Sequence, residues 1–306
     1  MHYFVTGASG FVGSAVVPEL IGAGHTVTGL SRSDAAAEAL AAAGARVQRG
    51  SLDDLDILRA AAADSDGVIH LAFKHDIAFS GHFDQAAEAD RVAVAAFGDV
   101  LAGSGRPLVI ASGIPGGHGG VTTERDGIEP ASLADLPEGP RARQATAVLA
   151  RSLAEKGVRS SVVRLPIVHG EGDPGFLATL VGIARDKGVS GYVGDGGNHW
   201  TSVHDDDAAR LFRLAAEGAD AGSTLHAVDD EGVTLREIAG IIGRHLDLPV
   251  ASIAPEDASA HFGWLATFAA FDQKATSALT RKSTGWAPTG PGLIEDLETG
   301  HYFKEA

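Results

Sequence analysis

The sequence has no cysteine among its 306 residues. This absence excludes disulfide bonds, zinc sites with thiolate ligands and a cysteine nucleophile, and it leaves the redox compartment undetermined. The sequence also has no run of about 18 apolar residues, which a membrane-spanning helix requires. Its N-terminus, MHYFVTGASG, lacks a basic region followed by a long apolar core, so no signal peptide is predicted. We therefore expect a cytoplasmic protein.

Basic residues are scarce. The chain has 24 Lys and Arg against 40 Asp and Glu, which gives a formal net charge of -16. A surface of this charge repels nucleic-acid phosphates and anionic membranes, so neither is expected as a partner. Because 44% of the residues are hydrophobic, the chain can bury one sizeable core.

Short apolar runs alternate with alanine-rich segments of helical period in the first half of the chain. This alternation predicts a doubly wound parallel sheet of the Rossmann type, with helices on both faces. The predicted strands are 2–6, 26–30, 45–48, 67–72, 107–111 and 160–165, and the predicted helices are 11–23, 35–43, 54–63, 83–102 and 142–156.

The alternation loosens after Pro166, which divides the chain into two parts. We expect residues 1–166 to form a dinucleotide-binding domain and residues 167–306 mainly a smaller substrate-binding part. The segment 200–228 is expected to return to the first domain. It includes HDDDAARLFRLAAEG, a helix whose three aspartates can accept backbone N–H groups at its start. Further helices are predicted at 176–187 and 234–246.

The segment TGASGFVG (6–13) directly follows the first predicted strand and opens the first helix. Its glycines allow a tight turn, close approach of the backbone to a pyrophosphate, and packing of helix on sheet. The helix N-terminus offers N–H donors and positive potential to phosphates. This arrangement predicts a dinucleotide site that includes Gly7, Ser9, Gly10, Phe11, Val12 and Gly13.

The end of the second predicted strand indicates which dinucleotide binds. An acidic residue there would hold the ribose hydroxyls of NAD, whereas this chain has Ser31, Arg32 and Ser33. A cation between two hydroxyls suits a 2′-phosphate. We therefore predict NADP(H), with NAD as the less favoured cofactor. Asp34 comes slightly later and can cap the next helix instead.

Several segments together resemble one family. TGASGFVG and GVIHLAF (67–73) match its phosphate loop and fourth strand. VVRLPIVHG (162–170) is similar to its Arg-Pro-x-x-Val-Tyr-Gly segment, and SVHDDDAARLF (202–212) to its Val-His-Val-x-Asp-x-Ala segment. TRKSTGWAPTGPGLIEDL (280–297) resembles its usual ending. The family is the extended short-chain dehydrogenases/reductases of the NAD(P)-dependent epimerase/dehydratase kind, and the resemblance covers essentially the whole chain.

The resemblance implies where the cofactor lies. It places an adenine contact near Leu52, although the family often has an aspartate where Ser51 stands. It also implies a homodimer through the helices near 83–102 and 142–156. The remaining cofactor contacts that it implies, along the fourth strand and beside the nicotinamide, are Leu71, Ala72, Phe73, Leu165, Pro166 and Val168.

The catalytic tyrosine of this family has no counterpart in the sequence. Members usually carry Ser-Tyr-Lys, in which Tyr-x-x-x-Lys exchanges a proton with the substrate oxygen. The chain has only Tyr3, Tyr192 and Tyr302, and none is followed four residues later by lysine. Counting back from VVRLP puts the tyrosine position near Gly139 or Pro140, within EGPRARQATAVL (138–149). The chain thus resembles an atypical branch without this tyrosine.

The lysine position of the motif falls on Arg143 or Gln144. Arginine stays protonated at any working pH, so Arg143 cannot act as a general acid. It can still donate to the nicotinamide ribose and stabilise an oxyanion. In the serine region, IASGIPGG (110–117) offers Ser112 as the candidate, with Gly113 at the usual position of the catalytic serine or next to it.

The missing proton donor has several candidates. Lys74 and His75 follow the fourth strand, where parallel sheets bind ligands, and His118 and His169 follow the fifth and sixth strands. Each can also be an ordinary surface or hydrogen-bonding residue. No metal site is expected, because HGEGD (169–173) lacks a full ligand set and His204 with its aspartates reads as a helix start.

These features favour an NADP(H)-dependent reductase. Its substrate is expected to be a small carbonyl or related unsaturated compound, rather apolar if some of the aromatic residues in the second half line its pocket. An enzyme similar to nucleotide-sugar epimerases or dehydratases is an alternative, as is a dinucleotide-binding sensor without catalysis. The sequence does not name the substrate or the direction of reaction.

Overall fold

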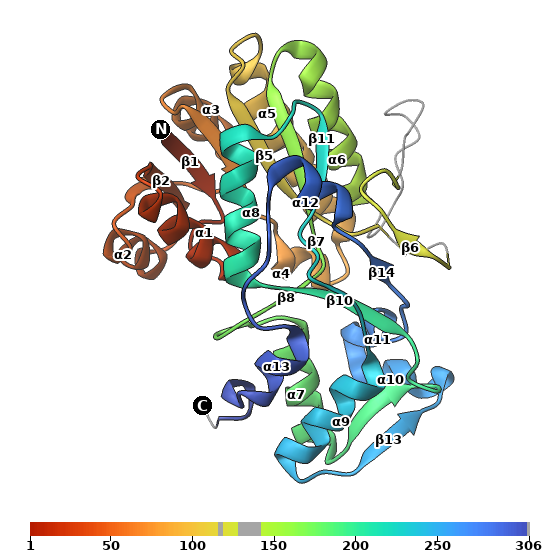
Figure 1. The fold of residues 1–306 in the computed structure, drawn as a ribbon. Helices are drawn as coiled ribbons and strands as arrows, with labels where there is room; N and C mark the ends of the chain where they lie inside the picture. The colour runs from red at the N-terminus through yellow and green to blue at the C-terminus, as the bar shows by residue number, and fades with distance from the viewer. Residues whose placement is uncertain (116–118, 128–141, 305–306) are drawn as a thin grey trace.

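The computed structural model describes residues 1–115, 119–127 and 142–304. Its centre is a seven-stranded parallel sheet with the strand order β3-β2-β1-β4-β5-β7-β11 (Figure 1). The direction of strand succession reverses between β1 and β4, and ligands of such sheets bind at the carboxyl ends of the strands beside this point. The strands are β1 (His2–Thr6), β2 (Thr26–Ser31), β3 (Arg46–Arg49), β4 (Gly67–His70), β5 (Pro107–Gly113), β7 (Arg159–Leu165) and β11 (Ser223–His226).

Helices cover both faces of this sheet. α1 (Phe11–Gly22) and α8 (Asp205–Gly218) pack on one face, and α3 (Leu55–Ala63), α5 (Phe83–Leu101) and α6 (Ala142–Ser152) pack on the other. α2 (Asp34–Ala42) connects β2 to β3. Because both faces are covered, strands such as β4 are buried throughout, which explains their short apolar runs.

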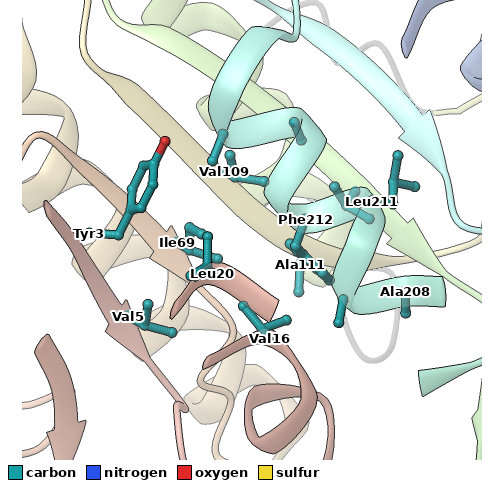
Figure 2. Close-up of a cluster of buried hydrophobic side chains, with 14 of the residues drawn as sticks. Tyr3, Val5, Val16, Leu20, Ile69, Val109, Ala111, Ala208, Leu211 and Phe212 are labelled. Atoms are coloured by element: carbon teal, nitrogen blue, oxygen red, sulfur yellow. The ribbon is translucent and has the colours of Figure 1, made fainter. Parts of the chain in front are cut away.

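Figure 2 shows the core between the sheet and the α1–α8 face. Strand side chains such as Val5, Ile69 and Val109 contact the apolar sides of the two helices, including Leu20 of α1 and Phe212 of α8. All five of these residues are 0% exposed. A separate cluster fills the opposite face, so the sheet is the middle layer of three.

The second part of the molecule lies at the carboxyl end of the sheet (Figure 1). It has its own hydrophobic core. The strands here are β8 (Ile167–His169), β10 (His199–His204) and β12 (Asp230–Thr234) in one sheet, β9 (Ser190–Val193) and β13 (Val250–Ile253) in another, and β6 (Val121–Thr122) with β14 (Lys274–Ala275). The helices here are α7 (Phe176–Lys187), α9 (Leu235–Leu246), α10 (Ala258–Phe262), α11 (Ala266–Ala269) and α13 (Leu293–Glu298). The short α4 (His75–Phe79) follows β4, and α12 (Ala278–Thr284) packs beside β11 and α8 of the first part.

Segment 200–228 divides between the two parts. β10 pairs with β8 and β12 in the second part, whereas α8 packs on α1 and β11 extends the central sheet beside β7. The α8 helix is capped by His204, whose side chain accepts the backbone N–H of Asp206. Asp205 also accepts that N–H. Asp207 instead accepts the N–H groups of Thr289 and Gly290, so it anchors the C-terminal segment.

No helix among the described residues is long and apolar enough to cross a membrane.

Candidate functional site

The glycine loop between β1 and α1 has the geometry that a dinucleotide requires. Gly7 has φ of 66°, and a Cβ on it would lie 2.7 Å from the backbone nitrogen of Ala72. A Cβ on Gly13 would lie 2.1 Å from the carbonyl oxygen of Gly7. Both positions therefore exclude a side chain, one by conformation and one by packing.

The start of α1 offers unused backbone donors. Gly10 is the N-cap residue and provides no side chain to accept the first N–H groups of the helix. Ser9 and Gly10 are exposed, and Phe11 and Val12 are half-buried. A Cβ on Gly10 would have a single near neighbour, the oxygen of Gly7 at 3.3 Å. The solvent side of the loop is thus open, and a pyrophosphate fits against these donors.

The end of β2 presents an unpaired cation. Arg32 is exposed and has no hydrogen bond or ion pair with the described residues. The hydroxyl of Ser31 donates to the carbonyl of Ser33 at 2.8 Å, and Ser33 caps α2 by accepting the N–H of Ala36. Asp34, in the first turn of that helix, forms an ion pair with Arg49. Ser33 therefore takes the capping role that the sequence allowed for Asp34.

The other predicted cofactor contacts lie at the carboxyl ends of the central strands. The residues that follow β4 (Leu71, Ala72 and Phe73) and those near the end of β7 (Leu165, Pro166 and Val168) are half-buried, whereas Leu52 is buried. The glycine loop also lies at the carboxyl ends of the strands. The structure therefore brings these residues to the same end of the sheet as the loop.

Arg143 lies at the start of α6 and reaches the ends of β4 and β5. Its guanidinium carbon stands 4.3 Å from the centre of the Phe73 ring. Its Nη2 donates to the carbonyl oxygen of Ala111 at 3.4 Å, and Ala111 directly precedes the buried Ser112 in β5. Burial lowers the pKa of Arg143, while the charge of Asp90 opposes this change. The structure thus brings Arg143 to Phe73 and to the backbone of β5 just before Ser112.

Lys74 and His75 have different surroundings. The Nζ of Lys74 donates to both carboxylate oxygens of Asp53, at 2.6 and 2.7 Å. His75 reaches the surface, but desolvation by its neighbours and the charge of Arg143 lower its pKa to about 4. Its imidazole is therefore neutral near pH 7 and does not offer an imidazolium proton.

The structure adds a buried polar chain that sequence reasoning missed. His70, the last residue of β4, contacts Thr6 of β1 through Nδ1 at 2.7 Å and Asp90 of α5 through Nε2 at 3.0 Å. All three side chains are at most 2% exposed. An aspartate on the buried face of a helix is rare. The position of Asp90 in the sequence could therefore have indicated a buried polar contact.

The three tyrosines have their partners elsewhere. The hydroxyl of Tyr3 contacts the sulfur of Met1, Tyr192 packs under Arg236, and the hydroxyl of Tyr302 donates to Asp173. Gly139, Pro140 and His118 lie outside the described residues.

A group of polar residues lies where β8 and β10 end. His169 is 0% exposed and its Nδ1 contacts Asp296 at 2.9 Å. Among the described residues, His204, Asp205 and Asp206 come close enough to share a cation. His204 already accepts an N–H as the helix cap, and the positive end of a helix opposes a cation, so we assign no metal to this group.

Comparison with known proteins identifies the family. The model of the NAD dependent epimerase/dehydratase family matches residues 3–228. The chain belongs to this family. It is therefore related to NAD(P)-dependent oxidoreductases, epimerases and dehydratases, and its seven-stranded sheet with the glycine loop is the Rossmann fold on which they are built.

Relatives of this epimerase/dehydratase family member match all or most of its length. An uncharacterised protein of Schizosaccharomyces pombe is 44% identical over 306 residues, which cover 99% of this chain and 100% of the relative. The sterol-4-alpha-carboxylate 3-dehydrogenase (decarboxylating) of Dictyostelium discoideum is 29% identical and covers 77% of this chain and 74% of its own. A farnesyl-dihydroquinoline-oxide ketoreductase of Stigmatella aurantiaca is 27% identical, covering 79% of this chain and 72% of its own.

Solved structures share the fold of this family member. MoeE5 in complex with UDP-glucose and NAD superposes with a TM-score of 0.77 over 98% of this chain and 97% of that chain, at 24% sequence identity.

Proposed function

We propose that the protein is an NADP(H)-dependent oxidoreductase that reduces a small, rather apolar carbonyl or related unsaturated compound. The observation that carries the proposal is the contact of Arg143 with Phe73 and with the carbonyl of Ala111, at the carboxyl ends of the strands. A fixed positive charge at this place stabilises the negative charge that develops on a carbonyl oxygen when the carbon accepts a hydride.

The residues of the cofactor site fit NADP(H). The glycine loop and the first turn of α1 would hold the pyrophosphate, and Arg32 would pair with the 2′-phosphate. Asp34 supports this assignment, because one oxygen of its carboxylate pairs with Arg49, which competes with the ribose hydroxyls that an acidic residue holds in NAD binding. When bound, the nicotinamide ring supplies or accepts the hydride.

The apolar character of the substrate is inferred from a line of aromatic rings. Phe73, under Arg143, has its ring 5.1 Å from that of His75, which lies 5.6 Å from Phe79. Phe79 stacks on Trp264 at 4.6 Å. The rings thus lead from the proposed reaction centre into the second part of the molecule. Phe79 and Trp264 are 41% and 42% exposed, so apolar ring surface remains available to a ligand.

Two more distant relatives support the apolar character of the substrate but not its small size, because a sterol dehydrogenase and a farnesyl-quinoline ketoreductase are oxidoreductases named for large apolar molecules. An enzyme acting on a nucleotide sugar is the second candidate, favoured by the likeness in fold to MoeE5, whose structure holds UDP-glucose. A cofactor-binding sensor without catalysis is the third.

Cofactor titration tests the proposed NADP(H) preference. Replacing Arg32 with Ala should weaken NADPH binding by roughly 1.5–3 kcal/mol, as expected for a hydrogen bond to a charged group, and should leave NADH binding nearly unchanged. Arg46→Ala, at the start of the neighbouring strand β3, is the matched control, because Arg46 is also exposed. Equal losses for both cofactors in Arg32→Ala would contradict the NADP assignment.

Turnover separates the three candidate functions. The unaltered protein should oxidise NADPH in the presence of at least one apolar ketone, imine or enone from a broad panel. Conversion of UDP-glucose without net use of cofactor would support the nucleotide-sugar candidate. Tight NADPH binding without turnover of either class would support the sensor.

A further inference from the structure

With Asp90 ionised and the ring of His70 neutral, the buried chain Thr6–His70–Asp90 has one consistent arrangement of protons. The carboxylate can only accept, so Nε2 of His70 donates to its Oδ1 at 3.0 Å. The other nitrogen of the neutral ring, Nδ1, then accepts the hydroxyl proton of Thr6 at 2.7 Å. Thr6 in turn accepts the backbone N–H of Ala72 at 3.3 Å. The chain thus fixes one oxygen of Asp90 from the end of β4.

The second oxygen of Asp90 is buried and has no hydrogen-bond partner among the described residues. The same holds for Nε of Arg143. The two charges are close enough that Asp90 raises the pKa of Arg143 against the effect of burial. Buried polar atoms almost always have hydrogen-bond partners. An acceptor on Asp90 and a donor on Arg143 that both lack a partner suit a ligand group that both donates and accepts. A hydroxyl group has this property.

We propose that Asp90 is the catalytic acid–base that exchanges a proton with the substrate oxygen. In alcohol oxidation, its Oδ2 would take the hydroxyl proton as the C–O bond becomes a carbonyl, and a bound nicotinamide would supply the acceptor for the hydride that leaves the carbon. In the reverse direction, the protonated carboxyl returns that proton to the oxygen as the carbonyl carbon accepts the hydride. Arg143 donates to the oxygen in both directions. This role rests on the proposed oxidoreductase function.

The neighbouring groups are less suited to this exchange. The ammonium of Lys74 is held by Asp53, the exposed His75 packs its ring against Phe73 and Phe79, and Arg143 does not release a proton. Asp90 combines an open oxygen, a fixed orientation and a position beside Arg143. His70 and Thr6 are positioning residues, because they hold the carboxylate without facing the substrate oxygen.

The experiment compares Asp90→Asn with the unaltered protein and with Asp99→Asn, an exposed aspartate on the same helix. With a carbonyl that the unaltered protein reduces, Asp90→Asn should lose about 10²- to 10⁴-fold in kcat. Its affinity for NADPH and its circular dichroism should stay unchanged. Asp99→Asn should keep full activity. Asp90→Ala leaves space for a small acid, so added formate should restore part of its rate, which a purely structural role of Asp90 would not explain.

The outcomes distinguish this role from the function on which it rests. Turnover that survives in Asp90→Asn, or a loss in Asp90→Ala that formate does not reduce, would overturn the role of Asp90 and leave the oxidoreductase function standing. If the unaltered protein binds NADPH but reduces no carbonyl and oxidises no alcohol, the proposed function fails and the role of Asp90 fails with it.

Discussion

Arg143 shows how one residue can acquire a role through its surroundings. An arginine near a helix start is usually exposed, but here the guanidinium packs over Phe73 and its Nε is buried. The cation–π contact and the carbonyl of Ala111 hold the group in one position. A rigid charge in a partly dry site acts more strongly on a developing oxyanion than a mobile surface charge does.

Substitution of Arg143 tests this role. Arg143→Ala should reduce turnover by about 10²-fold or more, the loss typical of removing one oxyanion donor. Arg143→Lys keeps the charge but not the planar donor group, so a smaller loss is expected. Steady-state kinetics and NADPH titration measure both effects. Turnover and cofactor affinity that remain intact in Arg143→Ala would mean that the residue only supports packing.

His226, on β11, should make stability depend on pH. Burial and the neighbouring charge of Arg164 lower its pKa from 6.5 to about 4. Between these values the unfolded chain binds a proton that the folded protein does not, so the free energy of unfolding decreases as the pH falls from 6.5 towards 4. One residue contributes a slope of at most about 1.4 kcal/mol per pH unit.

Urea unfolding at several pH values checks this prediction. His226→Asn should flatten the decrease in that window, whatever its effect on the absolute stability. His82→Asn, a substitution of an exposed histidine, should leave the slope as it is. An unchanged slope in His226→Asn would show that other groups dominate the acid response.

At the scale of elements, the β1–α1 turn combines two separate requirements. Gly7 and Gly13 are needed for the turn and the packing, whereas Gly10 faces open space apart from the oxygen of Gly7. The fold should therefore tolerate a side chain at Gly10 better than at the other two positions. Binding of a ligand that approaches the backbone at Gly10 should not tolerate it.

Gly10→Val should abolish measurable binding of NADPH and leave the circular dichroism spectrum unchanged, because a branched side chain would occupy the path of the pyrophosphate. Gly22→Ala is the control in the same helix, since a Cβ there would meet nothing within 4 Å. Isothermal titration measures the affinities. Undiminished binding by Gly10→Val would place the dinucleotide elsewhere.

At the scale of the whole molecule, the C-terminal segment around residues 286–290 connects the second part of the molecule to α8 of the first part. Trp286 is 1% exposed, and its Nε1 donates to the carbonyl oxygen of Asp207 at 2.9 Å. The carboxylate of Asp207 accepts the backbone N–H groups that follow at Thr289 and Gly290. A segment far along the chain thus closes over α8, whose other side contacts α1.

Trp286→Ala should destabilise the protein by about 3–5 kcal/mol, because it removes a large buried side chain and leaves a cavity. Trp264→Ala should cost less than about 1 kcal/mol, because that ring is 42% exposed. Thermal or urea unfolding measures both changes. Similar losses for the two variants would contradict the anchoring role of Trp286.

The sequence by itself determined the central sheet and the cofactor loop. Every strand predicted between residues 2 and 165 is a strand of the central sheet, and the first three predicted helices agree with α1, α2 and α3 within two residues at each end. The reason is local: strand runs, helix periodicity and the glycine spacing of 6–13 are properties of contiguous residues. The helix predicted at 142–156 ends as an α-helix at Ser152 and continues as a 3-10 turn, a local distinction that periodicity does not resolve.

Only the tertiary structure decided which polar side chains meet. Thr6, His70 and Asp90 come from β1, β4 and α5, and the charge of Asp90 acts on Arg143 of α6. Nothing in the local sequence around Asp90 specifies a partner, because its neighbours in the sequence only determine that it is helical. The contacts follow from the strand order, which places β1 next to β4, and from the packing of α5 against α6. Burial then removes the water that would otherwise hydrogen-bond to these groups, so their unpartnered atoms are available to a ligand.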